Sequence, residues 1–188
     1  MLRMKISAEE ALTNGNPELA LTELQDAVRS DPGDAALRIF LFQLLCIKGH
    51  WERALTQLDL CAELDAAAIP MRETYRSAIH CEMLRAEVFK GRKSPLLFGE
   101  PEVWIAQLIE SVIRAGRGDV EASNQFRKEA FDAAPSTGRL LNEQRFEWIA
   151  DARMHLGPVL HCVGRAPSSW LPVARVAKAP IEPPAAPP

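Results

Sequence analysis

Two stretches near the N-terminus of this chain carry the same pattern of residues, offset by 34 positions. In each, a glycine is followed by two small residues, which pairs Gly15 with Gly49, Ala20 with Ala54 and Ala27 with Cys61. Glycine adopts a positive φ and so ends one helix, while small residues on the next helix let the two pack closely. The repeat therefore predicts pairs of antiparallel helices.

A third copy of the pattern lies farther along the chain and places its residues at the same internal offsets: Gly118, Ser123, Ala130 and Pro135. A period of 34 is that of tetratricopeptide (TPR) helical hairpins, which stack into a solenoid. The third copy begins 69 residues after Gly49, one more than two periods. We interpret the intervening segment, residues 71–93, as a single irregular helix.

Hydrophobic periodicity and turn residues predict helices at residues 7–13, 18–30, 35–48, 51–63, 71–89, 102–115 and 120–133. Ser7 and Glu10 form a capping-box pattern, which predicts that the first helix begins there. Proline should stop the second helix of each pair, at Pro32 in the first copy and, displaced, at Pro70 in the second. Beyond the third copy, residues 136–151 predict a short strand or hairpin, and residues 157–164 the end of a helix and an extended segment.

These elements indicate a mainly α fold, a TPR-like α-helical hairpin solenoid with a small irregular or β-containing C-terminal segment. We expect a helical repeat domain over residues 1–136 and the start of a truncated β-containing region over 137–172. Residues 173–188 are rich in proline and alanine and are expected to be disordered. Three tryptophans are expected in the core: Trp51, Trp104 and Trp148.

Composition excludes several classes of function. The 188 residues are 47% hydrophobic and 25% charged, which is ordinary for one globular domain. A net charge of −3 gives no electrostatic case for binding nucleic acid or an anionic membrane. No apolar run approaches the length that spans a bilayer, and the N-terminus lacks a signal-peptide pattern, so we expect a cytoplasmic protein. The four cysteines form no CxxC pair, which favours reduced thiols.

Few residues suggest a catalytic, metal-binding or phosphate-binding site. Two His-Cys dipeptides, at residues 80–81 and 161–162, are too far apart in sequence to predict a zinc site. The GRGD at residues 116–119 is the turn of the third helix pair, and the GRKS at 91–94 lacks the upstream glycine of a phosphate-binding loop. Four carboxylates stand in distinctive motifs: Glu100, Glu102, Glu147 and Asp151. We expect Glu102 to cap the helix after Pro101, and we expect no catalytic residue, cofactor or metal.

Four motifs occur in a particular order: FLFQLLC at residues 40–46, GHWERALTQLD at 49–59, FGEP at 98–101 and FEWIAD at 146–151. With them the chain, over roughly residues 5–163, resembles the ImpE/TagJ family (SciE-type) of bacterial type VI secretion accessory proteins. The resemblance implies a non-enzymatic adaptor. Its helical part would bind the N-terminal helix of the small subunit of the contractile sheath. It would also influence how the AAA+ unfoldase ATPase recycles that sheath.

Members of this family continue into a β-rich C-terminal domain, so we expect residues 168–184 to begin that region in a shortened form. The segment after FEWIAD also carries Arg153 and His155 where the family is more acidic. Two alternatives stay open: a degenerate or purely structural TPR scaffold, and, less favoured, a hydrolase that uses the FGEP and FEWIAD carboxylates. The sequence leaves the oligomeric state open.

The first helix of each TPR hairpin lines the concave face of the stack, which predicts where a partner would bind. The expected partner-binding residues are Ile39, Phe42, Gln43, Cys46, Arg72, Tyr75, Arg76 and Ile79. Phe42 stands where such repeats have a small residue, so it either fills a gap or projects to a partner, and packing is favoured. An apolar floor with a basic rim would suit an amphipathic helix with acidic flanks.

Overall fold

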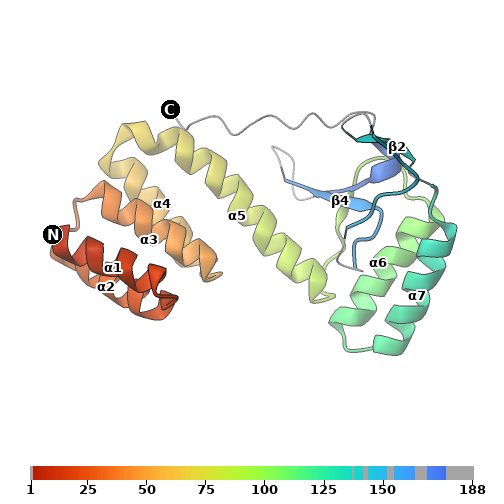
Figure 1. Cartoon of the computed structure of the whole chain (residues 1–188), viewed down its shortest axis with the longest axis horizontal. Helices are drawn as coiled ribbons and strands as arrows, with labels where there is room; N and C mark the ends of the chain where they lie inside the picture. The colour runs from red at the N-terminus through yellow and green to blue at the C-terminus, as the bar shows by residue number, and fades with distance from the viewer. Residues whose placement is uncertain (1, 137, 142–143, 152–154, 164–168, 177–188) are drawn as a thin grey trace. The chain divides into compact units, whose positions relative to one another are not determined.

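The computed structural model of the chain describes residues 2–136, 138–141, 144–151, 155–163 and 169–176. Within these ranges the chain is mainly helical, with short strands toward the C-terminus (Figure 1). It divides into two compact units, residues 1–80 and 81–188, and the boundary falls inside α5 (Ile69–Phe89). The expected mainly helical repeat fold with a small β-containing part is confirmed.

Unit 1 consists of two helical hairpins followed by the first part of α5. The first hairpin is formed by α1 (Leu2–Thr13) and α2 (Pro17–Ser30). The second is formed by α3 (Ala35–Ile47) and α4 (Trp51–Leu64), after which a short 3-10 helix, η1 (Ala66–Ala68), leads into α5. The helices of both hairpins lie within a few residues of the predicted ranges.

The repeated residues do what the pattern predicts. Gly15 and Gly49 end the first helix of each hairpin with φ of 72° and 71°, conformations that L side chains rarely adopt. The small residues on the second helices are almost completely inaccessible, at 2% exposure or less: Ala20, Ala27, Ala54 and Cys61. The two helices of a hairpin therefore approach each other through these positions.

Two helix boundaries in unit 1 were predicted wrongly. The first helix begins at Leu2, so Ser7 lies inside it and does not cap it. Pro70 is the second residue of α5 and stops no helix. Proline is tolerated in the first turn, where its missing N–H would have no partner within the helix. The end of α4 is instead formed by Asp65, whose N–H donates to the carbonyl of Cys61 at 2.9 Å and whose carboxylate accepts from the Ala67 N–H.

Unit 2 contains the third copy of the repeat. Here α6 (Val103–Gly116) and α7 (Val120–Ala133) form the hairpin, and Gly118 has a φ of 84° at the turn between them. The small-residue positions Ser123 and Ala130 are buried, as in unit 1. Ser123 is polar, and its hydroxyl is 3.3 Å from that of Ser111, so a hydrogen bond satisfies both inside the hairpin.

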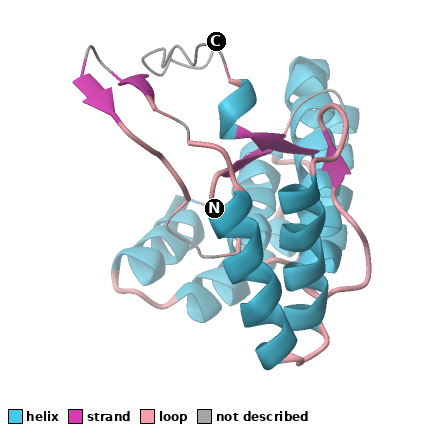
Figure 2. Ribbon diagram, turned by 90° about the vertical axis from the view of Figure 1, so that its right-hand side faces the viewer, coloured by secondary structure: helices cyan, strands magenta, loops and turns pink. Residues whose placement is uncertain are grey.

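A three-stranded sheet completes unit 2, and Figure 2 draws the strands in magenta. The strand order of this sheet is β1-β5-β4. The central strand β5 (Ser169–Pro172) pairs in parallel with β1 (Leu96–Leu97) and antiparallel with β4 (Val159–Cys162), so that Trp170 lies opposite both Leu97 and His161. A separate antiparallel hairpin joins β2 (Arg139–Leu141) to β3 (Gln144–Phe146).

β2, β3 and β4 fall where the sequence predicted extended structure at residues 136–151 and 157–164, whereas β1 lies in a segment that the sequence predicted to be a loop. The expected helix end at the start of the second segment is wrong, because residues 155–158 form turns. The segment expected to begin a truncated C-terminal region supplies the central strand of the sheet and then η2 (Val173–Arg175). Residues 177–188, part of the expected disordered tail, lie outside the described residues.

The core of unit 2 joins the helices to the sheet. Its buried members come from α5, α6, α7, β4, β5 and the turn before β4: Val88, Trp104, Ile105, Leu108, Val112, Ala130, Leu156, Val159 and Trp170. Trp104 is confirmed as a core residue. Trp148 is 71% exposed, so its predicted place in the core is wrong, and Trp51 in unit 1 is only partly buried.

Candidate partner-binding groove

A groove of about 600 Å³ lies between α1 and α3, the first helices of the two hairpins in unit 1. This is the face that the repeat predicts to be concave and available to a partner. The described residues that line it come from these two helices: Glu9, Leu12, Thr13, Ala36, Ile39, Phe40 and Gln43. Its apolar members Leu12, Ile39 and Phe40 are half-buried, and the remaining side chains are exposed at its edges.

The apolar character of the groove follows from the sequence of α3, AALRIFLFQLLCI, which is apolar on nearly every side. One set of its residues is buried in unit 1: Leu37, Leu41, Phe42, Leu44 and Leu45. A helix of this composition needs neighbours on most of its surface. The side toward α1 is less completely covered, because Ile39 and Phe40 stay half-exposed there.

The predicted partner-binding residues on α3 separate into two groups. Ile39 and Gln43 line the groove. Phe42 is 2% exposed, and its ring lies edge-on to that of Tyr75 on α5 with 5.3 Å between the ring centroids. Phe42 therefore fills the space between α3 and α5, the packing role that the sequence favoured. Cys46 is half-buried, and burial raises the pKa of its thiol.

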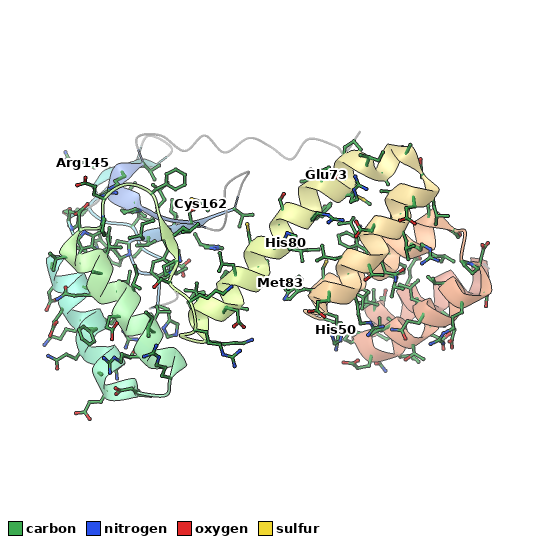
Figure 3. The ribbon with its side chains drawn as sticks, turned by 180° about the vertical axis from the view of Figure 1, so that it is seen from behind. His50, Glu73, His80, Met83, Arg145 and Cys162 are labelled. Carbon is green, nitrogen blue, oxygen red and sulfur yellow. The ribbon has the colours of Figure 1, made fainter. Side chains whose placement is uncertain are left out.

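The predicted residues on α5 are held by contacts within unit 1. The Arg76 guanidinium forms an ion pair with Asp59 of α4, and Arg72 pairs at 2.7 Å with Glu73, which Figure 3 labels on α5. Ile79 is 3% exposed. Tyr75 stays 47% exposed beside Phe42. The basic rim predicted from Arg72 and Arg76 is thus neutralised by neighbouring carboxylates.

The FGEP motif in unit 2 holds a distant arginine. Arg175 donates to the carbonyl of Phe98 at 2.5 Å, to that of Glu100 at 2.7 Å and to the carboxylate of Glu102 at 2.8 Å. Gly99 has a φ of 85°, and a side chain on it would collide with the Arg175 guanidinium. The motif is therefore explained by the need to bring its backbone against Arg175.

Glu102 stands at the N-cap position of α6, as expected, but its carboxylate makes no capping hydrogen bond. It accepts instead from the indole Nε1 of Trp104 at 2.9 Å and from Arg175. The hydrogen bond from Trp104, followed by that from Arg175, lowers the pKa of the Glu102 carboxyl. An acid held ionised in this way is unsuited to donate a proton at neutral pH.

The FEWIAD motif is held in place by hydrogen bonds to its main chain. The Ser136 hydroxyl donates to the carbonyl of Glu147 at 3.1 Å, and the N–H of Asp151 donates to the carbonyl of Gly157 at 2.7 Å. Burial, together with the charge of Arg85, lowers the pKa of His161. Within the described ranges no group of three or more His, Cys, Asp or Glu residues could hold a metal ion.

The chain is similar to a bacterial secretion protein over most of its length. It is 46% identical over 177 residues to a protein of Pseudomonas aeruginosa (strain PAO1) named type VI secretion system accessory component TagJ. The match covers 94% of this chain and 63% of that relative, so the chain spans less than two thirds of the relative's length. No family model matches the chain.

The fold has also been seen by crystallography. An X-ray structure of a Vibrio parahaemolyticus protein superposes with a TM-score of 0.80 at 25% sequence identity, covering 89% of this chain and 63% of that one. Among the helices described, none is both long and apolar enough to cross a membrane.

Proposed function

The similarity to TagJ over 94% of the chain places it in the TagJ/ImpE family of type VI secretion accessory proteins, and from this premise we propose that it acts as a non-enzymatic adaptor of a type VI secretion apparatus. We propose that its partner is the small subunit of the contractile sheath, bound through that subunit's N-terminal helix. Binding would modulate assembly of the sheath or its recycling by the unfoldase ATPase. We also propose that this adaptor acts in the cytoplasm.

The observation that carries the proposal is the groove between α1 and α3. Its floor is formed by the half-buried side chains Leu12, Ile39 and Phe40, and its edges by polar residues. An amphipathic helix binds by laying its apolar face into a groove of this kind, with anchors spaced three or four residues apart. The groove belongs to the repeat part of the chain, where Ile39 and Gln43 were predicted to meet a partner.

No observation favours the hydrolase alternative. The Glu102 carboxylate accepts from Trp104 and Arg175, which both hold it ionised, and the contacts described for Glu147 and Asp151 are made by their main chains. Each of these contacts shapes a loop of unit 2. The structure thus gives the Glu102 carboxylate structural partners and engages the main chains of Glu147 and Asp151, which supports the adaptor proposal.

A binding titration tests the proposal. A fluorescent peptide with the sequence of the N-terminal helix of the cognate small sheath subunit is titrated with the full chain, and anisotropy is followed. We expect saturable binding that Ile39→Asn weakens at least tenfold, because a polar amide would enter the apolar floor. The matched control is Ile47→Asn on the same helix, at a residue that is 75% exposed and outside the groove.

The control variant should bind as the parent chain does, and both variants should keep the helical circular dichroism of the parent. The proposal would be refuted if the folded parent chain did not bind the peptide. If the peptide bound with the same affinity to the Ile39→Asn variant, the partner would lie elsewhere on the chain.

A further inference from the structure

The charges around the groove differ from those predicted by the sequence. Glu9 of α1 is exposed and lines the groove. Its main-chain carbonyl accepts from the Thr13 hydroxyl at 3.0 Å, which turns that hydroxyl toward its own helix. In the part of the chain that the structure describes, the Glu9 carboxylate takes part in no ion pair. Among the side chains that the structure describes, the groove therefore carries one negative charge without an ion-pair partner.

The cations of α3 are engaged on other sides of the helix. Lys48 pairs with Glu18 of α2. Arg38 donates to the carbonyl of Pro32 at 2.8 Å and to the side-chain oxygen of Gln57 on α4 at 2.9 Å. These two side chains are thus held by α2, by α4 or by the loop before α3. Outside residues 1–6, whose side chains are not described, the residues that line the groove include no lysine, arginine or histidine.

The cations of α5 are occupied as well, since Arg72 and Arg76 are paired with Glu73 and Asp59. The acidic partner flanks expected from the sequence would therefore meet no free cation there and would be repelled by Glu9 in the groove. Charges across an interface are arranged to be complementary, and juxtaposed like charges suppress a wrong partner.

We propose that the occupant of the groove is an amphipathic helix with basic flanks, which presents a lysine or arginine to the Glu9 carboxylate while its apolar side chains cover Leu12, Ile39 and Phe40. This inference rests on the proposed function of the groove and adds the charge of the segment that the groove selects. Glu9 lies beside half-buried apolar side chains, so a bound helix would shield its ion pair from solvent and strengthen it.

Two designed peptides test the charge preference without any sheath sequence. They share one apolar face with anchors at positions i, i+3, i+4 and i+7, and differ only in carrying lysine or glutamate at the flanks. We expect the full chain to bind the lysine peptide about tenfold more tightly than the glutamate peptide at low salt. The difference should shrink to about twofold or less in 0.5 M salt, because mobile ions screen exposed charges.

The Glu9→Gln variant tests whether the preference for the lysine peptide depends on the Glu9 carboxylate. It should weaken binding of the lysine peptide about three- to tenfold and reduce its salt dependence, since the amide keeps the shape of the side chain and removes its charge. The matched control is Glu10→Gln, at the next residue of α1, which is exposed and does not line the groove. The control should leave both affinities unchanged.

The outcomes separate this inference from the proposed function. Selective binding of the lysine peptide that depends on Glu9, with no binding of the sheath peptide, would support the charge preference and refute the sheath as partner. Binding of the sheath peptide that is unchanged by Glu9→Gln would overturn the inference and leave the adaptor proposal standing. Equal binding of the two designed peptides, a preference for glutamate, or binding of neither would also overturn the inference.

Discussion

The side chains of Arg175 and Glu102 are separated by 73 positions in the sequence and meet at 2.8 Å in unit 2. The same guanidinium also donates to the carbonyls of Phe98 and Glu100. One side chain at the end of η2 therefore holds the loop that precedes α6. This arrangement leads to the first two predictions.

Arg175→Ala should destabilise unit 2, because two main-chain carbonyls and a carboxylate lose their charged donor. The pair with Glu102 is partly exposed and adds little by itself, so we expect a loss of about 2–5 °C in the melting temperature. Thermal unfolding followed by tryptophan fluorescence measures it. Arg117→Ala is the control, at an exposed residue that follows α6, and an equal loss in both variants would contradict the role given to Arg175.

The stability of unit 2 should depend on the ionisation of Glu102. Its pKa in the folded state is lowered by Trp104 and Arg175, so the stabilising contribution is present above its unfolded pKa of about 4.3. That contribution is lost as the pH falls through the lower folded pKa. Glu102→Gln should therefore be less stable at pH 7 and lose less additional stability between about pH 5 and pH 3. Urea unfolding at a series of pH values tests this, with Glu100→Gln as the control.

Trp170→Ala should be among the most damaging changes in unit 2. The side chain is 1% exposed in the core between helices and sheet, so its removal leaves a cavity that costs about 3–5 kcal/mol. Trp148→Ala, at a residue that is 71% exposed, should change the free energy of unfolding by about 0.5 kcal/mol or less. Chemical denaturation of the two variants tests the contrast, and similar losses would mean that the core is not organised around Trp170.

The small-residue positions of the repeat should tolerate alanine and reject larger side chains. Cys61 is completely buried between the helices of its hairpin. Cys61→Leu should therefore overpack the contact and cost about 1–3 kcal/mol, while Cys61→Ala should cost about 1 kcal/mol or less. Glu63→Leu on the exposed side of α4 is the control for adding leucine to this helix. A neutral effect of Cys61→Leu in urea unfolding would count against close packing at the repeat positions.

The contact between Phe42 and Tyr75 affects how binding variants are chosen. Phe42→Ala should cost about 3–5 kcal/mol, because the ring is 2% exposed and packs against α5. Loss of binding in that variant would therefore report damage to unit 1. Tyr75→Phe keeps the ring contact and should change stability by about 0.5 kcal/mol or less. If Phe42→Ala unfolded at the same urea concentration as the parent, the packing role of Phe42 would be wrong.

The hairpins could be predicted from the sequence because their signals are local. A glycine at a turn and small residues on the next helix act over one helix pair, and the same pattern recurs at Gly15, Gly49 and Gly118. The short strand or hairpin predicted within residues 136–151 and the extended segment predicted within 157–164 likewise rest on short runs of residues.

The features that were missed depend on contacts between distant segments. The pairing of Leu97 with Trp170 joins strands that are far apart in the chain, and no local sequence pattern near either residue predicts it. The neutralisation of Arg76 by Asp59 depends on how α4 and α5 are packed, which the pattern of α5 alone does not contain. The two groove residues Ile39 and Gln43 were predicted because the face of a TPR hairpin follows from its period, whereas Glu9 on the neighbouring helix was not singled out.

The placement of β5 at the centre of the sheet has a consequence for biosynthesis. The ribosome makes both hairpins of unit 1 early, and their contacts join residues that are close in the chain, so they can form as soon as they emerge. Trp104 and Leu108 instead remain without their strand partner until Trp170 has been translated. During that interval a nascent chain exposes apolar surface of unit 2, and chaperones or proteases have their best opportunity to act on it.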